Sequence, residues 1–117
     1  MEEKILKLKE YLHMDSLLPF AEYKEFYTEV IEELNKNYSE LDQKARLQAR
    51  YICNTIKVNA ESRARGNKIN GKAFKKMAAK CAFWVEAIDH RLGKEGLDLK
   101  EINRLMEEIN KTMEVEE

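Results

Sequence analysis

The stretch that most constrains the fold is residues 73–92, AFKKMAAKCAFWVEAIDHRL, the most apolar part of the chain. At about 100° per residue, its apolar side chains fall within one arc about 100° wide, the pattern of an amphipathic helix. The arc comprises Phe74, Met77, Ala78, Cys81, Val85, Ile88 and Leu92, and Ala82 and Trp84 widen it on its two sides. The pattern predicts a helix in the middle of a bundle, in which truncation of Phe74 or Val85 destabilises the fold.

Other segments show helical patterns around this one. They span residues 2–13, about 20–37, 40–65 and about 99–113. The sequence GNKING at 66–71 is the clearest break, and a turn there makes its two neighbours antiparallel. With 44% apolar and 37% charged residues and a single Pro, the composition is that of a helical globular domain. We expect an all-α fold: a compact bundle of four main helices plus a short N-terminal helix, built on the antiparallel hairpin 40–65/72–92 within one domain, 1–117.

Residues with capping chemistry mark several helix ends. Asn70 and Asp98 are expected N-caps, and Ser39 with Asp42 three residues later resembles a capping box. Gly66 stands where a left-handed residue commonly follows a helix. The last residues, EVEE at 114–117, are expected to fray.

Two cysteines, Cys53 and Cys81, lie inside helical patterns without the spacing of a metal or redox motif. Counted outward from the turn, they fall within one helical turn of the same layer, and we expect buried free thiols. No apolar run approaches the roughly 20 residues of a membrane span. The segment MEEKILKLKEYL begins with acids, unlike a secretory signal. These features predict a cytoplasmic protein with no membrane segment.

The net charge of −1 hides a strong segregation along the chain. Residues 1–42 hold five bases and eleven acids (net −6), residues 43–92 twelve bases and three acids (net +9), and residues 93–117 four bases and eight acids (net −4). A concentrated positive surface attracts nucleic-acid phosphates through counterion release. The candidate bases for such binding are Arg46, Arg50, Lys57, Arg63, Arg65, Lys68, Lys72, Lys75, Lys76 and Lys80.

On a helical wheel, Arg46 and Arg50 fall opposite the apolar stripe of segment 40–65, on the expected solvent side. Two alternatives to nucleic-acid binding remain. In the first, the acidic flanking helices lie beside the bases and neutralise them. In the second, the positive surface binds an acidic protein.

Phe83 occupies an unusual position for a large aromatic side chain, because the wheel places it among lysines on the polar side of 72–92. Either the first or last helix covers it, or it is offered to a partner or to a second copy of the chain. The candidate residues for protein interaction are therefore Ala79, Phe83, Ala87 and His90.

Candidate catalytic and metal-binding residues are few. Glu86 and His90 stand four residues apart, but a metal site in a helical bundle needs further Glu and His ligands, and the chain has only two histidines. No Gly-rich loop has the spacing of a phosphate-binding loop, and no Ser/His/Asp or Cys/His set is evident. We expect no enzyme, no metal site, no cofactor and no small-molecule substrate.

The leading hypothesis from the sequence is a small interaction protein, an adaptor or regulator, that binds a protein partner or associates with itself. The alternative is a nucleic-acid-associated protein that uses the basic hairpin. An enzyme or a metal carrier built on Glu86 and His90 is disfavoured.

Overall fold

The computed structural model describes residues 1–114, which fold into α-helices with no strand among them. The helices are α1 (Glu2–Leu12), α2 (Phe20–Asn37), α3 (Gln43–Gly66), α4 (Gly71–Lys94) and α5 (Leu99–Thr112), with a short 3-10 helix, η1 (Tyr38–Glu40), between α2 and α3. The all-α prediction is confirmed, and α3 and α4 form the expected hairpin. No helix in this part of the chain has the length and apolar character needed to cross a membrane. The expected fraying concerns residues 114–117, of which 115–117 lie outside the described residues.

The helix ends differ from the sequence prediction in detail. Asp42 is itself the N-cap of α3, its carboxylate accepting from the Ala45 amide at 2.8 Å, so the capping box with Ser39 was wrong. Ser39 lies in η1. Asp98 caps α5 as predicted, accepting from the Glu101 amide at 2.8 Å.

Asn70 occupies the N-cap position of α4, but its side chain makes no capping hydrogen bond. The Asn67 side chain instead accepts from the backbone amides of Ile69 and Asn70 at 3.0 and 2.8 Å. Gly66 is the last residue of α3 and is not left-handed, so that prediction was wrong. The positive φ, 97°, belongs to Gly96 in the turn between α4 and α5, a conformation that glycine adopts without steric cost.

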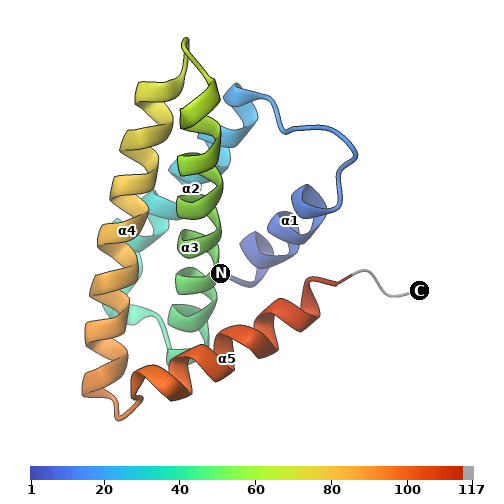
Figure 1. The fold of residues 1–117 in the computed structure, drawn as a ribbon. Coiled ribbons are helices and arrows are strands. Elements are labelled where there is room, and N and C mark those ends of the chain that lie inside the picture. Colours follow the sequence, from blue (N-terminus) through green and yellow to red (C-terminus); the bar gives the residue numbers. More distant parts are fainter. Residues whose placement is uncertain (115–117) are drawn as a thin grey trace.

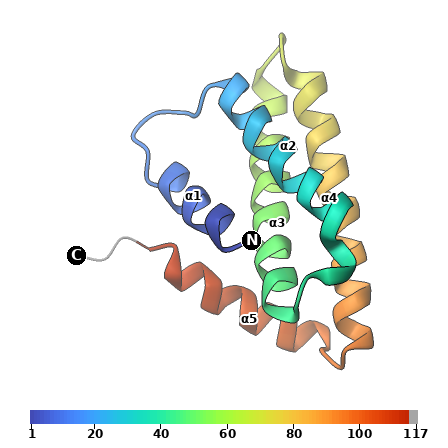
Figure 2. The same ribbon diagram turned by 180° about the vertical axis from the view of Figure 1, so that it is seen from behind.

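The helix at the centre of the bundle is α3, not α4. α3 packs against α1, α2, α4 and α5, whereas α4 packs mainly against α3 and the start of α5. Figure 1 shows α3 and α4 side by side, with α1 and α5 projecting on the side of α3 that faces away from α4. In the opposite view α2 runs obliquely across the hairpin (Figure 2). The sequence favoured α4 because its buried side chains are large and apolar, while those of α3 include Arg46, Gln48 and Arg50.

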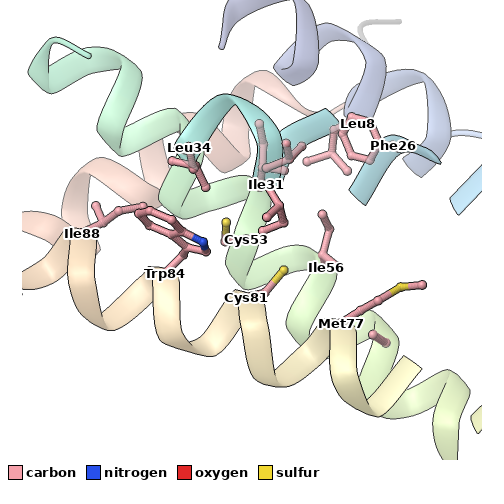
Figure 3. Close-up of a cluster of buried hydrophobic side chains, with 14 of the residues drawn as sticks. Leu8, Phe26, Ile31, Leu34, Cys53, Ile56, Met77, Cys81, Trp84 and Ile88 are labelled. Carbon is pink, nitrogen blue, oxygen red and sulfur yellow. The ribbon is translucent and has the colours of Figure 1, made fainter. Parts of the chain in front are cut away.

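The core of the hairpin is built from small residues on both helices. Ala49, Cys53 and Ala60 on α3 are fully buried, as is Cys81 on α4. Figure 3 shows the sulfurs of the two cysteines in the interior between α3 and α4, as their spacing from the turn predicted. Small side chains let the two helix backbones approach closely and leave room for larger side chains from α2.

An aromatic cluster closes the end of the core near the α3–α4 turn. The Phe74 ring is 1% exposed and meets the rings of Phe20 and Tyr23 edge to face, with centroids 5.3 and 5.2 Å apart. Tyr23 donates to the Ile56 carbonyl at 3.3 Å. Val85, predicted to belong to the same core face, is only half-buried. Phe74 therefore anchors α2 on the hairpin far more than Val85 does.

We expect Phe74→Ala to lower the free energy of unfolding by about 3–5 kcal/mol, because it opens a cavity in a fully packed site. Phe83→Ala on the same helix removes the same atoms from a side chain that is 52% exposed, and we expect a loss below about 1 kcal/mol. Urea unfolding followed by circular dichroism measures both. Equal losses for the two variants would contradict the assignment of inner and outer faces of α4.

Candidate functional site

Two of the candidate bases in α3 are structural. Arg46 is 4% exposed and its Nη1 lies 2.5 Å from Glu95 Oε2. Arg50 is 9% exposed and pairs through two nitrogens with the Asp89 carboxylate. The prediction that these arginines form a solvent face was wrong. They neutralise acids of α4 and of the α4–α5 turn, and a buried charge that is already paired is not free to bind a phosphate.

The surroundings of Glu95 agree with this role. Burial acts to raise the pKa of its carboxyl, but hydrogen bonds from Gln43 and Arg91 and the positive charges of Arg46 and Arg91 hold that pKa below its ordinary value. Glu95 therefore remains an anion at neutral pH and links the start of α3, at Gln43 and Arg46, to the end of α4, at Arg91.

Arg63 is also occupied by contacts within the protein. Its Nη1 donates to the Leu18 carbonyl at 2.8 Å, and its guanidinium carbon lies 4.9 Å from the centroid of the Tyr23 ring. The side chain is half-buried, as is that of Lys57. Of the ten bases proposed from the sequence, Arg46, Arg50 and Arg63 are thus removed from the free surface.

Five of the remaining seven bases gather on the outer side of α4 and in the turn before it. Lys68 in the turn and Lys72, Lys75, Lys76 and Lys80 on α4 are exposed; we call these five residues the α4 basic face. Among residues 1–114 no carboxylate lies within 4.0 Å of any of these five ammonium groups. From Lys72 to Lys80 the face runs about 12 Å along the helix axis. Arg65 is exposed near the same end of the hairpin.

Several acids of the flanking helices pair with bases outside this face. On α2, Glu33 and Glu29 pair with Lys4 and Lys7 of α1 at 2.5 and 3.6 Å. On α5, Arg104 pairs within its own helix with Glu101 and Glu108. Since α1 and α5 project away from α4 (Figures 1 and 2), their acids stay on the opposite side of α3.

A groove of about 460 Å³ between α2 and α4 extends the basic face. Lys24 of α2 faces Lys72 and Lys76 of α4 across it, and Tyr27 and Met77 are part of its wall. Burial raises the pKa of Tyr27 to about 12, so its hydroxyl stays neutral at pH 7. Lys24 was not among the sequence candidates, because only the fold brings α2 to the edge of α4. Lys94, exposed on α4 and in helical register with Lys76, was also missed although the periodicity contains it.

Phe83 is not covered by the first or last helix. It is 52% exposed and its ring lies 5.5 Å from the Trp84 ring and 5.3 Å from the Lys80 ammonium. Ala79 and His90 are exposed beside it, but Ala87 is half-buried and its carbonyl accepts from the Tyr38 hydroxyl at 3.2 Å. The apolar strip expected for protein interaction is therefore narrow and borders the α4 basic face.

Glu86 and His90 are both exposed on α4. Within residues 1–114 no group of three His, Cys, Asp or Glu side chains is placed to hold a metal ion. Both cysteines are buried. The pKa of the Cys53 thiol is raised well above its ordinary value, mainly by a hydrogen bond with the Cys81 thiol and to a smaller extent by burial. A thiol in this state is a poor nucleophile.

No known family model matches this chain, no curated protein matches it in sequence, and no solved structure matches its fold.

Asp89→Asn tests the structural role of the α3 arginines. It leaves the buried guanidinium of Arg50 without its carboxylate, and we expect a loss of about 3 kcal/mol in the free energy of unfolding. This is at the low end for broken buried pairs, because the Asp89 side chain is 30% exposed. Glu86→Gln, an exposed acid on the same helix, is the matched control and is expected to change stability by less than about 0.5 kcal/mol. A loss for Asp89→Asn no larger than the control would mean that Arg50 is not held by this pair.

Proposed function

We propose that this chain is a small non-enzymatic interaction protein, an adaptor or regulator, which binds the phosphate backbone of nucleic acid through the α4 basic face. The observation that supports the proposal is the set of five exposed lysines without a carboxylate neighbour among the described residues. Closely spaced lysines without acidic neighbours repel one another, and binding a polyanion relieves this repulsion and releases counterions from the polyanion.

The chemistry of the side chains favours backbone contacts over base reading. Lysine is a point charge on a flexible stem, so it matches many phosphate positions but distinguishes few. Arg46 and Arg50, two of the arginines that could read guanine edges, pair with Glu95 and Asp89 respectively. We therefore expect binding with little sequence preference and a steep dependence on salt.

Phe83 favours single strands over duplex. Its half-exposed ring lies at the end of the basic face, 5.3 Å from the Lys80 ammonium. A base of a strand whose phosphates meet Lys76 and Lys80 can stack on this ring, which a paired base inside a duplex cannot do. The combination of a basic track and an adjacent aromatic platform is typical of proteins that bind single strands.

Protein interaction through the strip of Ala79, Phe83 and His90 is the second candidate, favoured by the exposure of Phe83. A pair of copies that packed this strip with parallel α4 helices would bring Lys76 and Lys80 of one chain toward the same lysines of the other, and this like-charge contact opposes self-association in that arrangement. An acidic protein partner avoids the repulsion and competes for the same face.

A cytoplasmic location belongs to this proposal. Cys53 and Cys81 are free thiols, fully buried in the hairpin, and free thiols are typical of proteins from reducing compartments.

Fluorescence anisotropy with labelled single-stranded RNA and duplex DNA tests the proposed binding. Four neutralised phosphates give a fall in affinity of about a hundredfold between 50 and 200 mM salt. The double variant Lys72→Glu/Lys76→Glu is expected to weaken binding at least about tenfold and to reduce the salt dependence. Phe83→Ala is expected to lower the affinity for single-stranded RNA but not for duplex DNA.

Lys36→Glu/Lys111→Glu is the matched control, because it changes the net charge equally at exposed lysines of α2 and α5. The proposal fails if this control weakens binding as much as the α4 variant, or if the wild-type protein binds neither nucleic acid at low salt.

Sedimentation of the same samples tests the second candidate, protein interaction through the strip, separately from nucleic-acid binding. A wild-type dimer that Phe83→Asp converts to a folded monomer would support self-association through the strip.

A further inference from the structure

A second hollow lies on the other side of the molecule, where α1 and the connection to α2 pass over α2 and α3. It encloses about 240 Å³ and is lined mostly by aliphatic and aromatic side chains. Leu8 and Tyr11 of α1, Phe26 of α2 and Ile56 of α3 are part of its wall. In Figure 3 the side chains of Leu8 and Phe26 lie next to each other. The cavity is therefore bounded by three helices and is continuous with the apolar core.

One charged residue, Arg63, is part of this wall. No carboxylate of residues 1–114 lies within 4.0 Å of its guanidinium. The group is held in place by the Leu18 carbonyl on Nη1 and by the faces of Tyr23 and Phe74, whose ring centroids lie 4.9 and 5.7 Å from its central carbon. Its Nε is buried and has no hydrogen-bond partner. Arg63 is thus an oriented cation that lacks an anion.

The geometry points to a binding site for a small amphipathic monocarboxylate, with its carboxylate on Arg63 and its apolar part in the cavity. A single arginine in the lining balances one negative charge, which fits a monoanion better than a phosphate or a dicarboxylate. Apart from Ser16, Thr55 and Asn59, the remaining wall offers apolar contact, as in most small-molecule sites.

The size of the cavity limits the apolar part. A cavity of about 150 Å³ lined by apolar side chains accepts one benzene molecule, so 240 Å³ accommodates one ring or a short alkyl chain and not a long fatty acid. At the rim Leu12, Met14 and Leu17 are exposed, and Leu17 is 79% exposed. A ligand in the cavity would cover part of this rim. The connection between α1 and α2 would then have an apolar contact with the ligand.

Octanoate and 1-octanol are a matched pair of probes, because they share the alkyl chain and differ in the charged group. We expect octanoate to shift the nuclear magnetic resonance signals of the Arg63 Nε–H and of the backbone amides between Leu12 and Leu18, in a saturable manner. The affinity for octanol is expected to be at least about tenfold lower, since it cannot form a charge-assisted pair with Arg63.

Arg63→Gln is expected to lower the affinity for octanoate about tenfold and to leave that for octanol unchanged, provided its circular dichroism and amide spectra show the native fold. Lys80→Gln removes an exposed lysine far from the cavity and is expected to leave octanoate binding unchanged. Three results would overturn the site: equal affinities for octanoate and octanol in the wild-type protein, octanoate shifts confined to the α4 lysines, or undiminished octanoate binding by a folded Arg63→Gln variant. If Arg63→Gln does not fold, the comparison of the two probes on the wild-type protein decides alone.

Discussion

The close packing of α3 against α4 is the constraint on which the rest of the structure depends. Alanines and cysteines at the contact, among them Ala49, Cys53 and Cys81, let the two backbones pack closely. One side of α3 is therefore covered by α4 and shielded from solvent. Once α3 is covered on one side by α4, the other helices can add only around its remaining surface. The arginines of α3 are then enclosed, and acids at the open end of the hairpin, Asp89 and Glu95, balance their charge.

This packing sorts the bases of the chain into two populations. Arg46, Arg50 and Arg63 of α3 stabilise the fold through carboxylates, a carbonyl and aromatic rings. The lysines of the α4 basic face point outward, because α1 and α5 add on the far side of α3 (Figure 1). Two acids of α2, Glu29 and Glu33, meanwhile pair with Lys7 and Lys4 of α1. A chain with almost no net charge thereby keeps a positive surface on one helix, and it is the arrangement of charge, rather than its total, that favours an anionic partner.

Much of the fold could be predicted from periodicity, since the apolar spacing and the GNKING break locate the hairpin to within about three residues. The position of α4 at the edge of the bundle could not be predicted in this way. Hydropathy assigns Arg46 and Arg50 to the solvent-exposed surface, although long charged side chains can be buried where a neighbouring helix supplies an acid to pair with them. The exposed lysines of α4 did follow from the helical wheel, which placed Phe83 on the same side but left open whether another helix covers it. The position of Lys24 could not be predicted, because its place beside α4 depends on the angle at which α2 crosses the hairpin. Arg63 could be assigned to a cavity only once the course of the chain from α1 to α2 was known.

The most direct test of this division of charges is a residue-level map of the surface that contacts a short single-stranded oligonucleotide at low salt, obtained from chemical shifts of the isotope-labelled protein. We expect the shifts to concentrate at Lys72, Lys76, Lys80 and Phe83, with Lys24 beside them, while the guanidinium signals of Arg46 and Arg50 stay unchanged. Shifts centred on α1 or α5, or a perturbed Arg50 with a silent α4, would contradict the assignment of α4 as the free basic surface.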